Sequence, residues 1–223
     1  MSNTILVVVA HADDEVLGCG GTIARHVAEG DAVHVVFMAD GVSSRAMNDS
    51  AELQRRNQAR DAALRILGVT NSYALDFPDN RMDSVPLLDV VKALELIVPQ
   101  VQPNRVYTHH HGDLNVDHRV THQAVMTACR PVPGSSVREF LTFEVMSSTE
   151  WATPGVEAFV PNAFIDIGGY LETKMKALEK YYMEMHPEPH SRSVVHIESQ
   201  ALHRGNCMGL KAAEAFQVVR LIL

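Results

Sequence analysis

An unbroken run of aliphatic residues, Ile5–Val9, leads directly into the polar sequence Ala10-His11-Ala12-Asp13-Asp14-Glu15. A short valine-rich run of this kind is typical of a strand buried on both faces of a sheet. In α/β proteins the residues after the first strand usually face a ligand, because binding sites gather at the carboxyl ends of the strands. The adjacent carboxylates of this turn repel one another unless a cation lies among them, and a metal ion is the simplest candidate.

Strand and helix patterns alternate along the rest of the chain. Strands are predicted over 4–9, 32–38, 71–76 and 104–109, and later over 138–146, 159–166 and 216–222. Helices are predicted over about 15–28, 49–67, 86–101 and 117–129, and later over 168–184 and 192–208. This order predicts an α/β, Rossmann-like fold: a mostly parallel sheet with helices on both faces. The 223 residues suit a single domain, 1–223, in which no repeat or linker is visible.

Charge and cysteine content exclude several classes of protein. A net charge of -8 gives none of the basic footprint that nucleic acids or anionic membranes require, so neither is an expected partner. No segment approaches the ~20 apolar residues of a membrane span, and the first residues show no signal-peptide pattern. Cys19, Cys129 and Cys207 are odd in number and far apart, which argues against a disulfide framework and predicts a cytoplasmic location.

A second polar cluster follows the predicted strand 104–109. It begins with His109-His110-His111 and ends with Asn115-Val116-Asp117-His118. Because both clusters follow strands of one parallel sheet, we expect them at the same sheet edge, where they can converge on one point. Imidazole and carboxylate without thiolate suit Zn²⁺, although Fe²⁺ and Co²⁺ accept the same ligands. Three protein ligands leave a position open for water, which is typical of a hydrolytic site.

Each cluster alone also has an ordinary structural explanation. Acidic residues at a helix start compensate the helix dipole, and a histidine triplet is more often a surface or core feature than a set of ligands. Their joint occurrence at two strand ends favours the metal site. The glycines of Gly18-Cys19-Gly20-Gly21 do not form a dinucleotide loop, because they fall inside the predicted helix and the preceding carboxylates would repel a pyrophosphate. We expect them to permit close packing of helix on sheet.

The sequence at 10–15 resembles the A-H-P-D-D-E signature of the PIG-L/LmbE-like N-deacetylases, and Asn-Val-Asp-His at 115–118 resembles their second signature. Weaker similarity extends over most of the chain, at 79–81, 147–151 and 213–216. The resemblance implies a zinc-dependent enzyme that removes acetyl groups from N-acetylated amino sugars or their conjugates. It also implies a homo-oligomer, and among its partners a small-molecule N-acetyl sugar substrate.

The resemblance also implies roles for individual residues. His11, Asp14 and His118 match the metal ligands, and Asp13 matches the general base. Asp117 would orient a neighbouring imidazole or the ligand His118 from outside the ligand shell.

Other positions concern the substrate. Arg45 resembles an arginine that contacts substrate in relatives, and His190 and Arg192 are candidates for the pocket rim. As ordinary surface residues of a loop, the last two have an equally good structural explanation.

Two positions depart from the family pattern. Ala12 replaces the usual proline, which changes the rigidity of the turn, and Asn115 stands where many members have a histidine. An amide can donate a hydrogen bond to an oxyanion, but it cannot protonate the leaving amine. The acid is then either Asp13, protonated in the first step, or a histidine of the triplet, with His109 preferred because it ends the strand.

The predicted activity is therefore metal-dependent hydrolysis of an N-acetyl amino sugar, or of its nucleotide or lipid conjugate, to acetate and free amine. Two alternatives stay open at this stage. The chain could hydrolyse a different amide, such as that of a thiol-conjugated sugar, with the same metal residues. It could also be a degenerate, non-catalytic sugar-binding member, which Asn115 favours and Asp13 opposes, since a pure binding site needs no base.

Overall fold

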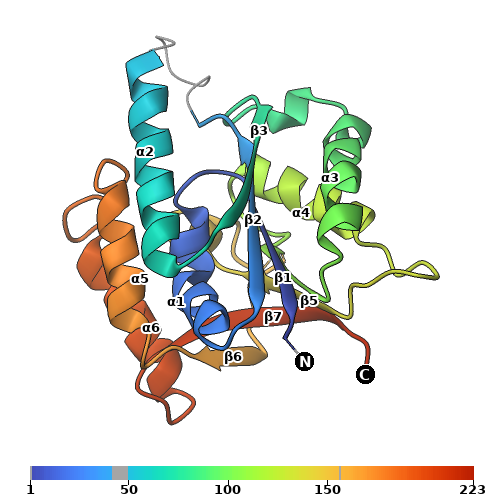
Figure 1. Cartoon of the computed structure of the whole chain (residues 1–223). Coiled ribbons are helices and arrows are strands. Elements are labelled where there is room, and N and C mark those ends of the chain that lie inside the picture. Colours follow the sequence, from blue (N-terminus) through green and yellow to red (C-terminus); the bar gives the residue numbers. More distant parts are fainter. Residues whose placement is uncertain (1, 42–49, 156) are drawn as a thin grey trace.

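The computed structural model describes residues 2–41, 50–155 and 157–223. The strands form one seven-stranded sheet in the order β3-β2-β1-β4-β5-β7-β6 (Figure 1). The first five are parallel, and β7 runs antiparallel between β5 and β6. The strands are β1 Thr4–Val9, β2 Ala32–Ala39, β3 Asn71–Phe77, β4 Arg105–His109, β5 Glu139–Phe143, β6 Ala163–Asp166 and β7 Ala213–Leu221.

Helices cover both faces of the sheet, as predicted (Figure 1). They are α1 Asp14–Ala28, α2 Ser50–Leu67, α3 Leu87–Val101, α4 Val116–Ala128, α5 Leu171–Leu178 and α6 Val194–Asn206, with short 3-10 turns η1 Met82–Ser84, η2 Thr149–Trp151 and η3 Glu179–Tyr181. Ile5 and Val7 of β1 point into the core beneath α1, α2, α5 and α6, whereas Leu6 and Val8 point into the core beneath α3 and α4. Both faces of β1 are therefore buried, which explains its continuous aliphatic sequence.

Several predicted boundaries are wrong in the second half of the chain. The strand predicted to 146 ends at Phe143, because the chain turns and the Val145 N–H donates to Oγ1 of Thr149 at 2.8 Å. The strand predicted from 159 begins at Ala163, after Pro161, which has no N–H for a ladder. The last strand begins at Ala213, before the predicted 216, because it pairs with β6 from its first residue.

The helix predicted over 168–184 is also shorter than expected. Gly168 does not begin it, because its N–H donates to Oδ1 of Asp166 at 2.8 Å within a turn. The helix α5 starts at Leu171 and continues beyond Leu178 only as the tighter turn η3.

The glycines of α1 allow the close packing that the sequence predicts. A Cβ on Gly18 would overlap the ring of Phe143, and one on Gly21 would lie 2.7 Å from Ile167. The helix is interrupted at Cys19, where φ is -150° and ψ is 27°. Glu214 of β7 accepts the N–H groups of Gly21 and Thr22 at 2.9 and 2.7 Å, so a side chain satisfies the backbone beside the break.

The order of strands reverses between β1 and β4. Consecutive connections lead from β1 outward to β2 and β3, and the chain then returns to place β4 on the other side of β1. At such a switch point the loops after the two strands diverge and leave a crevice. Within the described residues, no helix combines the length and apolar character needed to span a bilayer. The cysteines Cys19, Cys129 and Cys207 are all free thiols.

Candidate active site

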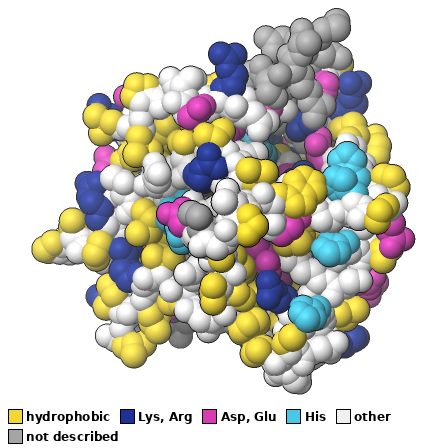
Figure 2. Space-filling view, turned by 180° about the vertical axis from the view of Figure 1, so that it is seen from behind, with side chains coloured by type: hydrophobic (Ala, Val, Ile, Leu, Met, Phe, Trp, Pro, Cys, Tyr) yellow, Lys and Arg dark blue, Asp and Glu magenta, His cyan; other side chains and the backbone are white. Residues whose placement is uncertain are grey.

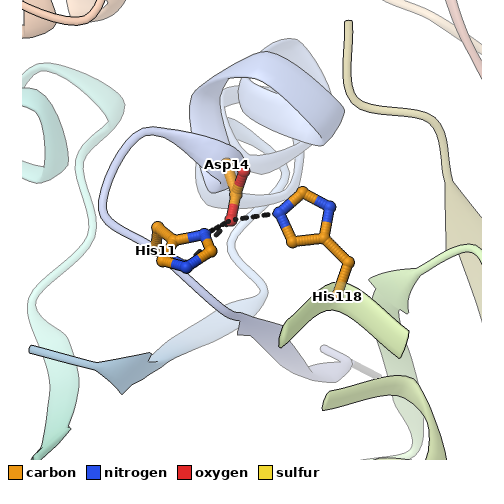
Figure 3. Close-up of side chains that lie close together, drawn as sticks. All are labelled: His11, Asp14 and His118. Atoms are coloured by element: carbon orange, nitrogen blue, oxygen red, sulfur yellow. Dashed lines mark hydrogen bonds and ion pairs between the residues drawn. The ribbon is translucent and has the colours of Figure 1, made fainter. Parts of the chain in front are cut away.

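His11 follows β1, Asp14 begins α1 and His118 lies in the first turn of α4, and the three side chains meet at the switch point (Figure 3). Oδ2 of Asp14 lies 3.4 Å from Nδ1 of His11 and 3.3 Å from Nε2 of His118. One donor atom from each residue lies within 4.8 Å of the other two, so the three can share one ion. Two imidazole nitrogens and one carboxylate oxygen form a donor set that suits Zn²⁺ and related divalent metals.

The carboxylate of Asp14 is held as an anion by its surroundings. Burial by itself raises the pKa of this group, but the neighbouring imidazoles, above all the positively charged His118, outweigh burial, and the pKa falls well below its ordinary value. The backbone N–H of His11 also donates to Oδ2 at 2.8 Å. The oxygen is thus fixed between the two rings, where a ligand atom is required.

Asp117 contacts His11 and not His118, which decides between the two partners considered for it. Its Oδ2 lies 3.0 Å from Nε2 of His11, and it accepts the N–H groups of Asn80 and Met82 at 2.6 and 2.9 Å. Asp79 lies on the same side, with Oδ1 3.3 Å from Nε2 of His11. These carboxylates can accept the Nε2–H of His11, which leaves Nδ1 facing Asp14 as a ligand nitrogen.

Asp113 occupies the corresponding place beside His118, and the sequence did not identify it. Its Oδ2 lies 3.2 Å from Nδ1 of His118. Thr149 donates its hydroxyl to the same oxygen at 2.6 Å, and Ser148 donates to Oδ1. These hydroxyls follow β5, far along the chain from Asp113. No local pattern joins them, so only the assembled sheet places the carboxylate.

Asp13, the residue that precedes α1, has an unusual backbone conformation. Its φ is 129° and its ψ is -28°, in a region that L-residues rarely adopt and that costs about 1–3 kcal/mol. Its N–H donates to Oε2 of Glu15 at 3.0 Å, and Tyr181 donates its hydroxyl to Oε1 of the same buried carboxyl at 2.7 Å. The carboxyl group of Glu15, held by Tyr181, therefore stabilises the strained turn.

The side chain of Asp13 pairs with Arg192. Oδ2 accepts Nη1–H of the guanidinium at 2.9 Å. Burial raises the pKa of Asp13, Arg192 lowers it and the charge of Asp14 raises it, and the outcome is a pKa of about 7. A carboxylate with such a pKa can exchange a proton near neutral pH.

An open cavity of about 200 Å³ adjoins these residues. Its wall includes the three candidate ligands together with Asp13 and Asn115. Asn115 caps α4: its Oδ1 accepts the Asp117 N–H at 2.8 Å, and its Nδ2 donates to Oδ1 of Asn80 at 3.2 Å. Because Oδ1 faces the helix, the Nδ2 donor of Asn115 lies on the other side of the amide, and it is available to a ligand in the cavity.

His109 is not on the cavity wall. Its ring stacks on His118 with centroids 3.9 Å apart, it is fully buried, and its Nε2 accepts the N–H of Ala10 at 2.9 Å. Burial first, and then the charge of His118, hold its pKa well below the ordinary value. A proton donor must touch the leaving amine, so this geometry does not support the acid role that the sequence suggested for His109.

The three predicted substrate residues have different positions. Arg192 lies on the cavity wall, whereas His190 does not line the cavity and accepts the Arg192 N–H on Nδ1 at 3.0 Å. Arg45 lies outside the described residues. Sequence reasoning missed Arg56 of α2 and Glu184, which form an ion pair on the same wall. They follow no motif that we singled out, and only the packing of α2 near η3 brings them to the cavity.

A Rossmann-like sheet with an imidazole and carboxylate cluster at its switch point defines an α/β protein with a candidate mononuclear metal site. The chain belongs to the PIG-L family, since the family profile described as GlcNAc-PI de-N-acetylase matches residues 6–129. It is 34% identical over 183 residues to the uncharacterized deacetylase YaiS of Escherichia coli (strain K12), covering 79% of this chain and 89% of that protein.

Two further comparisons extend over nearly the whole chain. Diacetylchitobiose deacetylase of Thermococcus kodakarensis is 23% identical over 228 residues, with 96% of this chain and 82% of that protein covered. The crystal structure of 4-carboxy-2-hydroxymuconate hydratase from Pseudomonas putida KT2440 has a TM-score of 0.79 at 24% identity and covers 100% of this chain and 98% of that one. The hydratase is similar in fold, and the fold by itself does not select the reaction.

Proposed function

We propose that the protein is a metal-dependent N-deacetylase that converts an N-acetylated amino sugar to acetate and the free amine. One observation carries the proposal: His11, Asp14 and His118 share a site, and the carboxylate of Asp13 lies beside it on a polar cavity. Membership of the PIG-L family and the deacetylases among the relatives support the same reaction.

The donor set fits a metal ion, because the partly buried imidazole of His11, the buried imidazole of His118 and a carboxylate converge, while outer carboxylates contact the far nitrogen of each ring. Bound there, zinc would supply Lewis acidity to the acetyl carbonyl and lower the pKa of water to about 7. Zinc is our proposal for the identity of the metal, since Fe²⁺ and Co²⁺ accept the same ligands.

Asp13 is the proposed base. Its Oδ2 is held by Arg192, so we assign proton transfer to Oδ1. It removes a proton from the attacking water, whose oxygen forms a bond to the acetyl carbon. The Nδ2–H of Asn115 then donates a hydrogen bond to the negative oxygen that develops on the carbonyl. When the carbon–nitrogen bond breaks, Asp13 returns the proton to the amine, because the triplet His109-His110-His111 is not on the cavity wall.

The substrate assignment follows from the cavity. Polar and charged groups dominate the wall, and Arg56 and Arg192 add cationic donors for hydroxyl or anionic oxygens. Such a wall suits a sugar more than an apolar amide. A different amide, or binding without turnover, would use the same residues and is an outcome of the test below. We further propose a cytoplasmic location, because free thiols are typical of a reducing compartment, and assembly into a homo-oligomer.

The test combines metal analysis with product analysis. The purified protein is expected to contain about one equivalent of divalent metal, and to release acetate from at least one member of a panel of N-acetyl amino sugars and their conjugates. Asp13→Asn should retain the metal and lose activity by about 10²–10⁴-fold, while Asp61→Asn, at an exposed position of α2, should match the wild type. Absence of bound metal together with insensitivity to chelators would contradict the proposal, as would an Asp13→Asn variant with full activity.

A further inference from the structure

Helix α1 is broken in its second turn, and an ion pair fills the break. The break lies at Cys19, whose backbone angles are not helical. In a regular helix the carbonyl of Leu17 would accept the N–H of Gly21, four residues later. Here the Leu17 carbonyl accepts Nζ–H of Lys174 at 3.0 Å, and the Gly21 N–H donates to Oε1 of Glu214 at 2.9 Å. Two side chains thus replace one backbone hydrogen bond of the helix.

A direct contact between the two side chains closes this bridge. Nζ of Lys174 lies 2.6 Å from Oε1 of Glu214. The other carboxylate oxygen accepts the N–H of Thr22 at 2.7 Å. The pair therefore satisfies backbone groups on both sides of the break, and side chains inserted into the hydrogen-bond ladder are a known cause of a helix kink.

The ion pair is buried, which is unusual for a lysine. Among the described residues, Lys174 is the only lysine or arginine that is buried, and Glu214 is buried with it. Figure 2 shows other Lys and Arg side chains scattered over the surface of the molecule. Apolar residues of similar volume often serve stability as well as a buried ion pair does. Only polar groups, however, can bond to both backbone ends of the break.

The first turn of α1 connects the ion pair to the candidate active site. The Leu17 carbonyl accepts from Lys174, and the N–H of Leu17 donates to the carbonyl of Asp13 at 2.9 Å. The Val16 N–H donates to the same carbonyl at 3.0 Å. Asp14 lies in this turn, between the two bonded ends. A displacement at Leu17 therefore moves the proposed base and the proposed metal ligand together.

Helix α5 and the turn that follows it hold the first turn of α1 at two points. Lys174 belongs to α5, which packs against α1, and Tyr181 belongs to η3. Tyr181 donates its hydroxyl to Glu15 at 2.7 Å, near the start of α1, whereas Lys174 bonds to Leu17, near the end of the turn. The orientation of the turn therefore depends on α5 and η3 as well as on the sheet.

We propose that Lys174 and Glu214 are positioning residues: by fixing the break in α1 they hold its first turn, and with it Asp14, in place for metal binding. This inference rests on the metal site of the proposed function. Neither residue lines the cavity, so both act through the helix and not on the substrate. An unbroken α1 would change the direction of the first turn, whereas Oδ2 of Asp14 must stay near Nε2 of His118, which is 3.3 Å away.

The test is a double variant that removes both charges and approximately keeps the volume. Lys174→Met/Glu214→Gln should fold, because no buried charge is left unpaired and the glutamine oxygen can still accept a backbone N–H. The Leu17 carbonyl loses its lysine donor, so the first turn should loosen. In the metal-free protein, the amides of Val16 and Leu17 should exchange hydrogen on the order of tenfold faster by NMR, with the amide of Val27, near the end of α1, changed less than about twofold.

Metal binding gives a second readout. The double variant should bind Co²⁺ on the order of tenfold more weakly, and the visible absorption bands of the bound ion, which depend on ligand geometry, should differ from those of the wild type. Arg105→Met/Glu139→Gln is the matched control, because it removes another partly buried ion pair, which joins β4 to β5 with Nε and Oε2 2.8 Å apart. The control should leave the exchange rates in α1 and the Co²⁺ spectrum unchanged.

Two results of these measurements overturn the proposal. If the folded double variant keeps the wild-type exchange rates and Co²⁺ spectrum, the pair contributes to packing alone. If the control changes both readouts equally, the effect is general destabilisation. Should the double variant not fold, Glu214→Gln decides: it loses one of two acceptor oxygens, so the same changes should appear to a smaller extent, and wild-type behaviour overturns the proposal.

This inference and the proposed function can fail separately. If the wild type releases no acetate from any N-acetyl sugar, the proposed function fails, while hydrogen exchange and the Co²⁺ spectrum still decide the role of the pair. With an active wild type at saturating metal, Lys174→Met/Glu214→Gln should lower kcat on the order of tenfold and change KM less than about twofold, because the cavity wall keeps its residues. A loss that lies in KM alone would contradict the positioning role.

Discussion

Replacing Asp113 with alanine should weaken metal binding although no proposed ligand is removed. The carboxylate lies 3.2 Å from Nδ1 of His118, and hydroxyl groups of Ser148 and Thr149 hold it in place. Burial by itself raises the pKa of Asp113, but the charge of His118 and the hydrogen bonds outweigh it and the pKa falls below its ordinary value. The group is therefore an anion that can fix the His118 ring with Nε2 toward the metal.

The size of the effect follows from this geometry. Removing the partner of a metal-binding imidazole typically costs 10–100-fold in metal affinity, or about 1.4–2.7 kcal/mol. Asp113→Ala should lower the metal affinity by about 100-fold, because both the charge and the acceptor oxygens are lost. Asp113→Asn should lower the metal affinity by about tenfold, because an amide oxygen can still accept a hydrogen bond from Ser148 or Thr149.

The assay is competition for Zn²⁺ with a chromophoric chelator, and thermal unfolding of the metal-free variants tests whether they fold. Asp61→Asn is the control, since this carboxylate is exposed on α2. If folded Asp113→Ala and Asp113→Asn both bind Zn²⁺ within about twofold of the wild type, the orientation of His118 does not depend on Asp113 and the reasoning is wrong.

Three further predictions concern pH and packing. Because Arg192 lowers the pKa of Asp13, which is about 7, Arg192→Ala should move the acid limb of kcat/KM to higher pH; an unshifted limb would exclude Asp13 as the titrating base. Burial lowers the pKa of the proposed ligands His11 and His118, but neighbouring carboxylates outweigh burial and raise the pKa of His11 to about 10 and that of His118 to about 9. Metal uptake at pH 7 should therefore release protons, and the apparent metal affinity should increase from pH 6 to 9. Calorimetry in buffers of different ionisation enthalpy would detect this release, and its absence would count against the protonated state. Gly18→Ala should destabilise the fold by about 1–3 kcal/mol in a denaturant titration, because its Cβ would overlap Phe143. Gly20→Ala is the control. Its Cβ would meet only side chains at 3.2 Å or more, so the free energy of unfolding should change by less than about 1 kcal/mol.

The first half of the fold was predictable because its signals are local. The aliphatic run 5–9 is buried on both faces, and the helical periodicity of 86–101 gives a helix within one residue of the prediction. The second half was less predictable because its boundaries depend on distant partners. The end of β5 is decided by a hydrogen bond to Thr149, and the start of β7 by pairing with β6.

The candidate site divides in the same way. The spacing of His11 and Asp14 and the position of His118 after another strand were sufficient to predict a shared site, because parallel strands end at one edge. The burial of His109 could not be predicted, because its stacking on His118 depends on how α4 packs over β4. For Arg45, which lies outside the described residues, substrate contact remains a prediction.

Sequence by itself determined which residues form the central strands and which donor atoms stand at their ends, since hydrophobic periodicity and residue chemistry are properties of short segments. Only the tertiary structure decided which carboxylate faces which imidazole: Asp117 with His11, and Asp113 with His118. The same holds for the pairing of Asp13 with Arg192 across the chain. Hydrogen bonds and ion pairs act over a few ångströms, and those distances are set by the packing of whole helices on the sheet and not by separation along the chain.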